Sequence, residues 1–289
     1  MPASTPHATQ SFQEWVGKTM IAHDDVTTFP LAAFAATLER DAVPGIVPPL
    51  WHWFYFLPVT PLSQAGPDGH QKRGGFLPPV ELPRRIWAGG RLTFHAPLRM
   101  GSHITRQSTI QRIEDKTGRT GRLVFVTVQH RIDADGVACI TEEHDIGYRE
   151  MSSVSLPDTN TGAKQPDRAP TGEAWSQVIN ADPVLLFRYS ALTFNSHRIH
   201  YDHPYVTQVE GYPDLVVHGP LIATLLADLV GQHQPERTMT SFSFRAVRPT
   251  FSGHPFTVCG TPSADGNSVD LWAKDHNGFL TMRATATLA

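Results

Sequence analysis

Residues 187–226 concentrate side chains that could carry out proton-transfer chemistry. The segment reads FRYSALTFNSHRIHYDHPYVTQVEGYPDLVVHGPLIATLL: an apolar run, then a polar turn with Asn195, His200 and Asp202, then a second apolar segment that begins after His218. Histidine can take or give a proton near neutral pH because its ordinary pKa lies near 6.5. We therefore expect a histidine of this turn to act as a general acid or base.

Two other interpretations of the histidines stay open. His197, His200 and His203 are spaced by three residues, and three histidines at such a spacing could ligate a metal ion. Pro204 disfavours a helix at His203, which argues against a shared helical face. A purely structural histidine cluster is the second alternative. We favour the acid/base interpretation and expect no metal site.

The dipeptide His218-Gly219 stands directly before Pro220 and a strongly apolar stretch. A helix that begins here presents free backbone N–H groups and a partial positive charge at its N-terminus. Glycine allows a ligand to approach that backbone closely. We expect the Gly219 N–H to bind a carbonyl oxygen that gains negative charge, as in an oxyanion hole. The alternative is a simple turn from strand to helix.

The composition fits a globular protein and excludes several classes. Of 289 residues, 40% are hydrophobic and 18% are charged, and the net charge of −3 provides no field that would favour nucleic acid or an anionic membrane. No apolar run approaches the roughly 20 residues of a membrane span. The N-terminus lacks the features of a targeting signal, so we expect a cytoplasmic location. Cys139 and Cys259 fit buried, reduced thiols.

A polar stretch divides the chain into two halves. Residues 151–174 are rich in Ser, Thr, Pro, Asp and Gly, which is typical of a linker. We therefore expect a disordered tail over 1–11, a first domain over 12–150 and a second domain over 175–289.

The two halves share an ordered pattern. RLTF precedes Pro97 and Gly101 in the first half, and SFSF precedes Pro249 and Gly253 in the second half at the same spacing. Each half ends in alternating strands around a hairpin signal, which is Asp135-Gly136 in one and Asn277-Gly278 in the other. The ordered match indicates an internal duplication.

Apolar segments before these strands predict helices. Residues 220–230 begin with proline and are followed by Gly231, and they are apolar nearly all round, as in a buried helix. We expect an equivalent buried helix over 49–57 (PLWHWFYFL) and a further helix over 30–40. A buried helix followed by a long antiparallel sheet in each half predicts an α+β double hotdog fold, with each sheet wrapping a helix.

The same residues carry a family resemblance. His200-x-Asp202 and the later His218-Gly219 resemble the D-x-N-P-x-H-x-D and H-G signature of the MaoC-like, (R)-specific enoyl-CoA hydratase family. The match extends to the branch with F-N-x-H-R-I-H-Y-D and E-G-Y-P-x-L-V-V-H-G-P-L. That branch contains mesaconyl-C4-CoA (3-methylfumaryl-CoA) and itaconyl-CoA hydratases and mitochondrial-type 3-hydroxyacyl-thioester dehydratases. PPLWHWFYFLP, KRGGFLPPVELPRR and WAGGRLTFHAPLRMG extend it over the first half.

The resemblance implies a hydro-lyase that adds or removes water at C3 of a 2-enoyl-CoA, on a C5 dicarboxylyl-CoA. We separately expect a homo-oligomer, a dimer, and no cofactor. Three alternatives stay open: a dehydratase of fatty acid synthesis, an acyl-CoA-binding protein without activity, and a thioesterase. A thioesterase of this fold would have a carboxylate near the helix, where the sequence offers only Asp228, close to the far end.

The resemblance also implies roles for single residues. His200 is the acid/base, and Asp202 and His218 support the turn. The family's catalytic aspartate falls on Asn195, which cannot take a proton, so Asn195 is expected to bind or steer water.

The substrate needs further residues that we expect from the rest of the chain. A distal carboxylate requires a cation, for which Arg198, Arg85 and Arg84 are candidates. Trp53 is the main candidate for a wall of the acyl tunnel. Trp51 and Phe54 could share that role or pack in the core.

Overall fold

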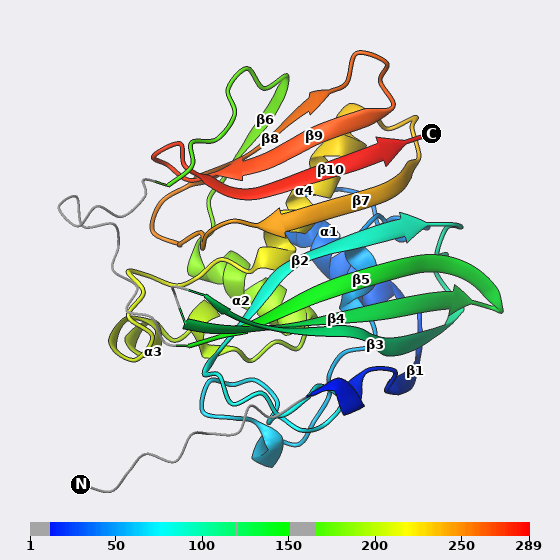
Figure 1. Ribbon diagram of the computed structural model, residues 1–289. Coiled ribbons are helices and arrows are strands. Elements are labelled where there is room, and N and C mark those ends of the chain that lie inside the picture. The colour runs from blue at the N-terminus through cyan, green and yellow to red at the C-terminus, as the bar shows by residue number, and fades with distance from the viewer. Residues whose placement is uncertain (1–11, 119–120, 151–165) are drawn as a thin grey trace, which may run out of the picture.

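The computed structural model describes residues 12–118, 121–150 and 166–289. The expected tail over 1–11 and residues 151–165 of the expected linker lie outside the described residues. Figure 1 shows helices gathered behind one large twisted sheet.

The described residues form a single antiparallel sheet of ten strands in the order β1-β3-β4-β5-β2-β7-β10-β9-β8-β6. The first half contributes β1 (Thr19–Asp25), β2 (Arg84–Phe94), β3 (His103–Gly118), β4 (Gly121–Ala134) and β5 (Val137–Arg149). The second half contributes β6 (Trp175–Ile179), β7 (Met239–Ala246), β8 (Phe256–Pro262), β9 (Ser268–Lys274) and β10 (Leu280–Leu288).

The two halves of the sheet have the same topology. Counted within its own half, each runs first-third-fourth-fifth-second strand from its outer edge to the centre. The second strands of the two halves, β2 and β7, pair with each other in the middle of the sheet (Figure 1). This agreement supports the internal duplication that the repeated sequence pattern indicates.

Two adjacent glycines allow β2 and β7 to approach closely. A Cβ on Gly89 would lie 2.6 Å from the carbonyl oxygen of Phe244, and a Cβ on Gly90 would lie 2.6 Å from the Phe244 ring. Side chains larger than hydrogen do not fit at either position. The WAGG segment thus sets the distance at which the two halves join.

The expected hairpin signals are observed as turns. Asp135-Gly136 forms a two-residue loop between β4 and β5, and both residues have positive φ angles, 49° and 84°. This conformation matches the twist of the flanking strands and favours an Asp-Gly pair. Gly278, with φ of 77°, lies in the longer turn between β9 and β10.

The long apolar helix of the second half is α4 (Gly219–His233), and it packs against β6–β10. It extends beyond the expected 220–230 because Gly231 lies inside its last turn rather than after it. The other described helices are α1 (Thr28–Thr37), α2 (Pro183–Leu192), α3 (His203–Gln208) and the 3-10 turns η1 (Gln13–Trp15), η2 (Trp51–Phe54), η3 (Leu62–Gln64) and η4 (Arg198–His200).

One helix expectation is wrong. Residues 49–57 form only the short turn η2, with left-handed backbone at Leu50 (φ 71°) and Phe56 (φ 55°) on either side. Prolines at both ends interrupt the helical hydrogen bonds, and a run of aromatic residues is a poor helix former. Trp51 and Phe54 pack instead in the core around Phe34 of α1, which is the helix expected over 30–40.

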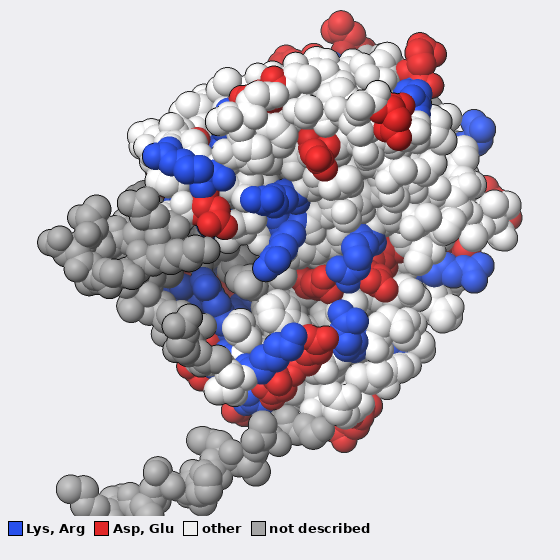
Figure 2. All heavy atoms as spheres, turned by 45° about the horizontal axis from the view of Figure 1, so that its top comes forward, with Lys and Arg blue, Asp and Glu red and all other residues white. Residues whose placement is uncertain are grey.

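Two surface observations bear on possible partners. On the face shown in Figure 2, Lys and Arg side chains are interspersed with Asp and Glu, so no extended region of one sign forms there. No helix among the described residues is both long and apolar enough to span a bilayer.

Cys139 and Cys259 are buried free thiols.

The joint between β2 and β7 can be tested by filling it. Gly89→Ala places a methyl group against the Phe244 backbone, and we expect it to destabilise the protein by about 1–3 kcal/mol because strands must separate. Gly45→Ala is the control, since nothing lies within 4 Å of its added Cβ, and it should change stability by less than about 0.5 kcal/mol. Urea unfolding measures both, and an equal effect of the two substitutions would contradict the close approach.

Candidate active site

The polar turn of the second half lies between α2 and α4. Asp182 caps α2 by accepting the Leu185 N–H at 2.8 Å, and η4 lies within the turn. Asp202 then caps α3, which begins at His203. The expectation that Pro204 would prevent a helix at His203 is wrong, because proline is well tolerated in the first turn of a helix.

His200 is held as a neutral base. It is 7% exposed, and its Nδ1 lies 2.6 Å from the carbonyl oxygen of Val216. A carbonyl only accepts hydrogen bonds, so Nδ1 carries the proton and Nε2 keeps a lone pair. Burial lowers the pKa of His200 to about 4, against the raising effect of the Val216 hydrogen bond. At neutral pH the ring is ready to accept a proton.

His218 supports His200 from the other side. The two rings stack with centroids 3.6 Å apart, and the Nε2 of His218 lies 2.8 Å from the Ser190 hydroxyl. The pKa of His218 lies well below its usual value because of burial and then the neighbouring His200 and His197. Its buried Nδ1 has no hydrogen-bond partner among the described residues. His218 also forms the N-cap of α4.

Gly219 is the first residue of α4, so its N–H belongs to the helix N-terminus, where backbone donors lack helical partners. No acceptor for this N–H occurs among the described residues. A Cβ at Gly219 would lie 3.2 Å from the indole ring of Trp87, which comes from β2 of the first half. The expected oxyanion donor thus faces an aromatic side chain of the other half.

The remaining polar residues of the turn brace its backbone. The Oδ1 of Asn195 accepts the His197 N–H at 3.1 Å. Asp202 accepts two hydrogen bonds from the Arg198 guanidinium, at 2.7 and 2.9 Å, and one from the Tyr205 N–H. The Asp202 carboxylate is therefore already hydrogen bonded to the Arg198 guanidinium and to the backbone of α3.

A loop of the first half is tied to this turn. Gly69 O accepts the Ser196 hydroxyl at 2.6 Å, and Asp68 O accepts the Arg198 N–H at 2.8 Å. The Arg198 guanidinium also donates to Pro67 O at 3.0 Å. Gly69 has φ of +90°, and a Cβ there would lie 1.8 Å from Ser196 O, so only glycine fits.

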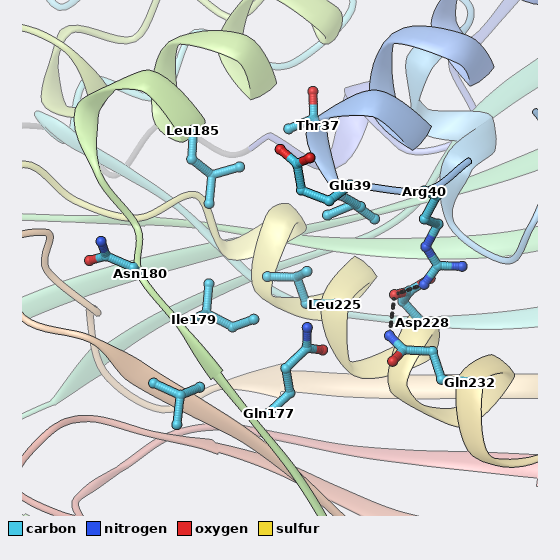
Figure 3. Close-up of a pocket in the computed structure, with 12 residues that line it drawn as sticks. Thr37, Glu39, Arg40, Gln177, Ile179, Asn180, Leu185, Leu225, Asp228 and Gln232 are labelled. Atoms are coloured by element: carbon cyan, nitrogen blue, oxygen red, sulfur yellow. Dashed lines mark hydrogen bonds and ion pairs between the residues drawn. The ribbon is translucent and has the colours of Figure 1, made fainter. Parts of the chain in front are cut away.

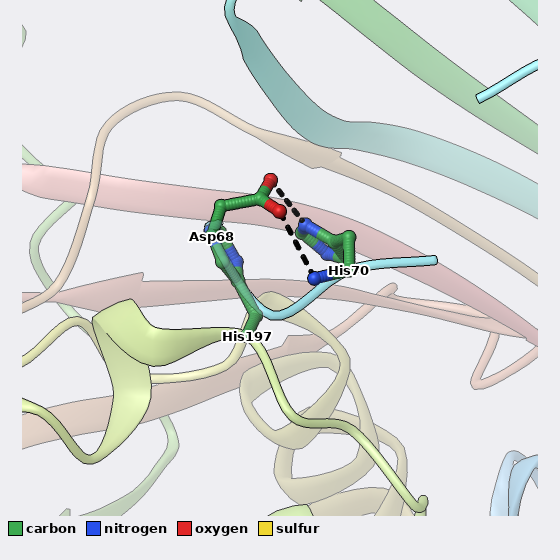
Figure 4. Close-up of side chains that lie close together, drawn as sticks. All are labelled: Asp68, His70 and His197. Atoms are coloured by element: carbon green, nitrogen blue, oxygen red, sulfur yellow. Dashed lines mark hydrogen bonds and ion pairs between the residues drawn. The ribbon is translucent and has the colours of Figure 1, made fainter. Parts of the chain in front are cut away.

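This loop places Asp68 and His70 beside His197 (Figure 4). The Asp68 carboxylate accepts the His70 backbone N–H at 3.0 Å and lies 3.1 Å from His70 Nδ1. The ring centroids of His70 and His197 are 3.9 Å apart. His197 packs edge to face on His200, with ring centroids 5.4 Å apart. A ligand atom from each of Asp68, His70 and His197 lies within 4.8 Å of the others.

The histidine trio weighed from the sequence is not assembled. His203 is 59% exposed and lies 3.7 Å from Asp214, outside the group around His197. Sequence reasoning missed Asp68, His70, Ser190 and Trp87. The Gly-Pro-Asp-Gly-His run of the loop reads as an ordinary turn, and nothing in its spacing connects it with residues more than a hundred positions away.

The three arginines considered for the distal carboxylate differ in whether their side chains already have partners. Arg198 is bound to Asp202 and stacks on Tyr205, and buried Arg84 donates to Glu210 O at 2.6 Å. The side chain of Arg85 has no hydrogen bond or ion pair within the part of the chain that the structure describes. Its charge acts on both His70 and His197, where it lowers the pKa.

Trp53 belongs to a buried polar cluster of the first half. Its Nε1 donates to Glu142 at 2.7 Å, and His52 Nε2 lies 3.0 Å from the same carboxylate. Burial alone would raise the pKa of Glu142, but the neighbouring His144 and His52 hold it well below its usual value. Trp53 packs edge to face on Trp87, with ring centroids 5.2 Å apart. The cluster therefore supports an aromatic wall, formed by Trp53 and Trp87, whose Trp87 ring faces Gly219.

A separate pocket of about 480 Å³ lies between the end of α1, β6 and α4 (Figure 3). Asp228 lines it, paired with Arg40 and hydrogen bonded to Gln232 at 2.9 Å. Asp228 stands nine residues after Gly219, roughly 13 Å along the helix. This carboxylate is therefore remote from His200 and does not fit a thioesterase that acts at that site.

Comparisons with known proteins show the family of the chain. A family model described as hydroxyacyl-thioester dehydratase type 2 matches residues 50–252. A mesaconyl-C(4)-CoA hydratase of Chloroflexus aurantiacus is 46% identical over 279 residues, covering 95% of this chain and 96% of that protein. A mitochondrial hydroxyacyl-thioester dehydratase type 2 of Schizosaccharomyces pombe is 27% identical over 274 residues, covering 83% and 89%.

A solved structure shows the fold. A conserved Mycobacterium tuberculosis protein described as a double hotdog superposes with a TM-score of 0.52 at 13% identity, covering 95% of this chain and 96% of that one. The α+β double hotdog expectation is confirmed. The family match spans more than half of the chain and includes the turn, α4 and the aromatic wall. The chain belongs to the hydroxyacyl-thioester dehydratase type 2 family of MaoC-like proteins.

Proposed function

We propose that this protein is a hydro-lyase that adds water at C3 of a 2-enoyl-CoA, and that its substrate is a C5 dicarboxylyl-CoA of the mesaconyl-C4-CoA type. The observation that carries the proposal is the neutral, buried His200, whose free Nε2 belongs to the same site as the unpaired N–H of Gly219. The 46% identity to a mesaconyl-C(4)-CoA hydratase supports the choice of substrate.

The proposed mechanism uses this geometry directly. The thioester carbonyl oxygen accepts the Gly219 N–H, and the α4 N-terminus stabilises the negative charge of the enolate. Asn195 and His200 hold a water molecule against C3. His200 Nε2 takes a proton from that water as the oxygen bonds to C3, and it returns a proton to C2, so the net change is OH at C3 and H at C2.

The reverse reaction requires the same groups, so a dehydratase is the second candidate. The match to the hydroxyacyl-thioester dehydratase type 2 model favours it as a related activity on 3-hydroxyacyl thioesters. Rates on mesaconyl-C4-CoA, itaconyl-CoA, crotonyl-CoA and a 3-hydroxyacyl-CoA separate the two. An acyl-CoA-binding protein without turnover would bind these thioesters and convert none.

Arg85 is proposed to bind the distal carboxylate of the substrate. Its guanidinium lies close enough to His197 and His70 to lower the pKa of both, and it has no ion-pair partner among the described residues. Arg85 and Trp87 are two positions apart on β2, so both side chains leave the same face of the strand. A cation on the face of the aromatic wall suits a substrate with a second carboxylate.

The two halves are proposed to divide the work. The second domain, 175–289, carries the acid/base and the oxyanion donor, while the first, 12–150, shapes the acyl and CoA tunnel with Trp53 and Trp87. We further propose that the protein works in the cytoplasm as a homodimer that binds neither nucleic acid nor membrane. Light scattering after size-exclusion chromatography tests the dimer, and a monomeric mass would contradict it.

Removing the proposed base should abolish turnover. We expect His200→Ala to lower kcat by about 100- to 10,000-fold, because no other group then accepts the proton of water. His203→Ala is the matched control, since this exposed histidine lies outside the site, and its rate should stay near that of the original protein. Hydration is followed by loss of enoyl-thioester absorbance. Retained activity in folded His200→Ala would refute the assignment.

The pH profile should carry the signature of a buried histidine. Because burial lowers the pKa of His200 to about 4, its base form persists well below pH 6 and is lost only near pH 4. We expect kcat/KM on a substrate of fixed charge, such as crotonyl-pantetheine, which lacks the titrating phosphate of CoA, to stay level from pH 8 to about pH 5 and then to fall. Circular dichroism at each pH checks folding. A limb near 6.5 would mean that an exposed histidine is the base.

Arg85 can be tested by the choice of substrate. Arg85→Ala removes the cation proposed for the distal carboxylate, so kcat/KM on mesaconyl-C4-CoA should fall about 10- to 100-fold. The value on crotonyl-CoA, which lacks that carboxylate, should change less than about threefold, within the range of an ordinary surface substitution. Equal losses on both substrates would exclude the proposed role.

A further inference from the structure

Asn195 cannot take a proton, which raises the question of where a carboxylate enters this site. Asp202 is committed to Arg198 and to the Tyr205 N–H. The carboxylate that contacts the histidines is Asp68, and it belongs to the first half of the chain. Three hydrogen bonds between loop and turn hold it there.

Asp68 stands at one end of an unbroken row of rings. The ring centroids are 3.9 Å apart between His70 and His197 and 5.4 Å apart between His197 and His200. Those of His200 and His218 are 3.6 Å apart. The row crosses from the first half to the second at the His70–His197 contact (Figure 4). A change at Asp68 can therefore reach His200 through directly contacting side chains.

Asp68 determines which nitrogen of His70 carries a proton. Burial would raise the pKa of Asp68, but its hydrogen bond with His70 and the nearby His70 and His197 rings lower it, so the carboxylate stays ionised at neutral pH. An ionised carboxylate only accepts, so the His70 Nδ1 at 3.1 Å must donate. His70 Nε2 then keeps a lone pair.

His197 is held as a neutral acceptor. Burial, followed by the charges of His70 and His200, lowers its pKa to about 2, with Arg85 acting in the same direction and Asp68 against it. A neutral imidazole has one N–H and one lone pair. One ring nitrogen of His197 lies within 4.8 Å of the Asp68 carboxylate, which favours the N–H on that nitrogen and leaves the lone pair on the other.

We infer that Asp68 is a positioning residue which, through His70, holds His197 against His200 so that His197 accepts one hydrogen of the reacting water while His200 accepts the other. Two acceptors orient the lone pair of the water toward C3, and Asn195 need not act as a base. His197 neither gains nor loses a proton, and the proton passes to His200 as before. The inference rests on the proposed hydration.

The same three side chains could instead hold a divalent metal ion, since their ligand atoms lie within 4.8 Å of one another. Two observations favour the positioning role. Arg85 and Arg73 place positive charge at His70, which opposes a cation there. The Asp68 carboxylate already accepts two hydrogen bonds, both from His70.

Kinetics of Asp68→Asn test the inference. The amide matches the carboxylate in shape but carries no charge, so we expect kcat to fall about 10- to 100-fold through misplacement of the acceptor, with KM changed less than about threefold. Asp68→Glu should recover part of the rate. Asp115→Asn, which removes an exposed carboxylate paired with Arg122, is the matched control and should not differ from the original protein. Asp68→Asn with kcat within about twofold of the original protein would overturn the inference while leaving the proposed function intact.

A second measurement does not depend on turnover. Nitrogen-15 NMR of the histidine rings should show His70 as the neutral Nδ1–H form in the original protein and should show changed His70 and His197 signals in Asp68→Asn. A His70 that is protonated on Nε2 instead, or signals unchanged by the substitution, would overturn the inference even if no thioester is hydrated. Bound zinc at one equivalent, lost in Asp68→Asn and with chelator-sensitive activity, would also overturn it in favour of a metal site.

Discussion

The pairing of β2 with β7 is the constraint on which the rest of the molecule depends. Gly89 and Gly90 let the two strands approach closely around Phe244, and this fixes the relative position of the halves. It also brings Trp87 against Gly219. The candidate site therefore draws on both halves, because the N-terminus of α4 comes from the second and the Trp87 ring that faces it comes from the first.

Burial is the second organising effect, and it acts on the histidines. Charging an imidazole away from water is costly, so His200 and His218 remain neutral far below the pKa of a free histidine. The Val216 carbonyl accepts the Nδ1–H of His200, and the Ser190 hydroxyl lies beside Nε2 of His218, whose Nδ1 has no hydrogen-bond partner among the described residues. Desolvation thus keeps His200 neutral, and the Val216 carbonyl fixes its tautomer, which are the two properties that the proposed proton abstraction from water requires.

The two halves show how a duplicated fold can specialise. Their strand orders are equivalent, yet only the second half has the long buried helix α4. In the first half the corresponding interior is filled by aromatic side chains around Trp51, and the buried Glu142 anchors Trp53. The first half therefore has the same sheet as the second, with aromatic side chains in place of a long helix. Its loop at Asp68 contacts the polar turn of the second half.

Sequence alone determined the features that depend on neighbouring residues. The Asp135-Gly136 hairpin and the buried α4 follow from local backbone preference and apolar pattern, and the motif predicts His200 as the acid/base. Tertiary structure decided the rest. The absence of an ion-pair partner for Arg85 among the described residues depends on packing between segments more than a hundred residues apart. The same is true of the contact between the Asp68 loop and His197. Such contacts are set by strand register and by the close approach of backbones, and these leave no periodic signal in the chain.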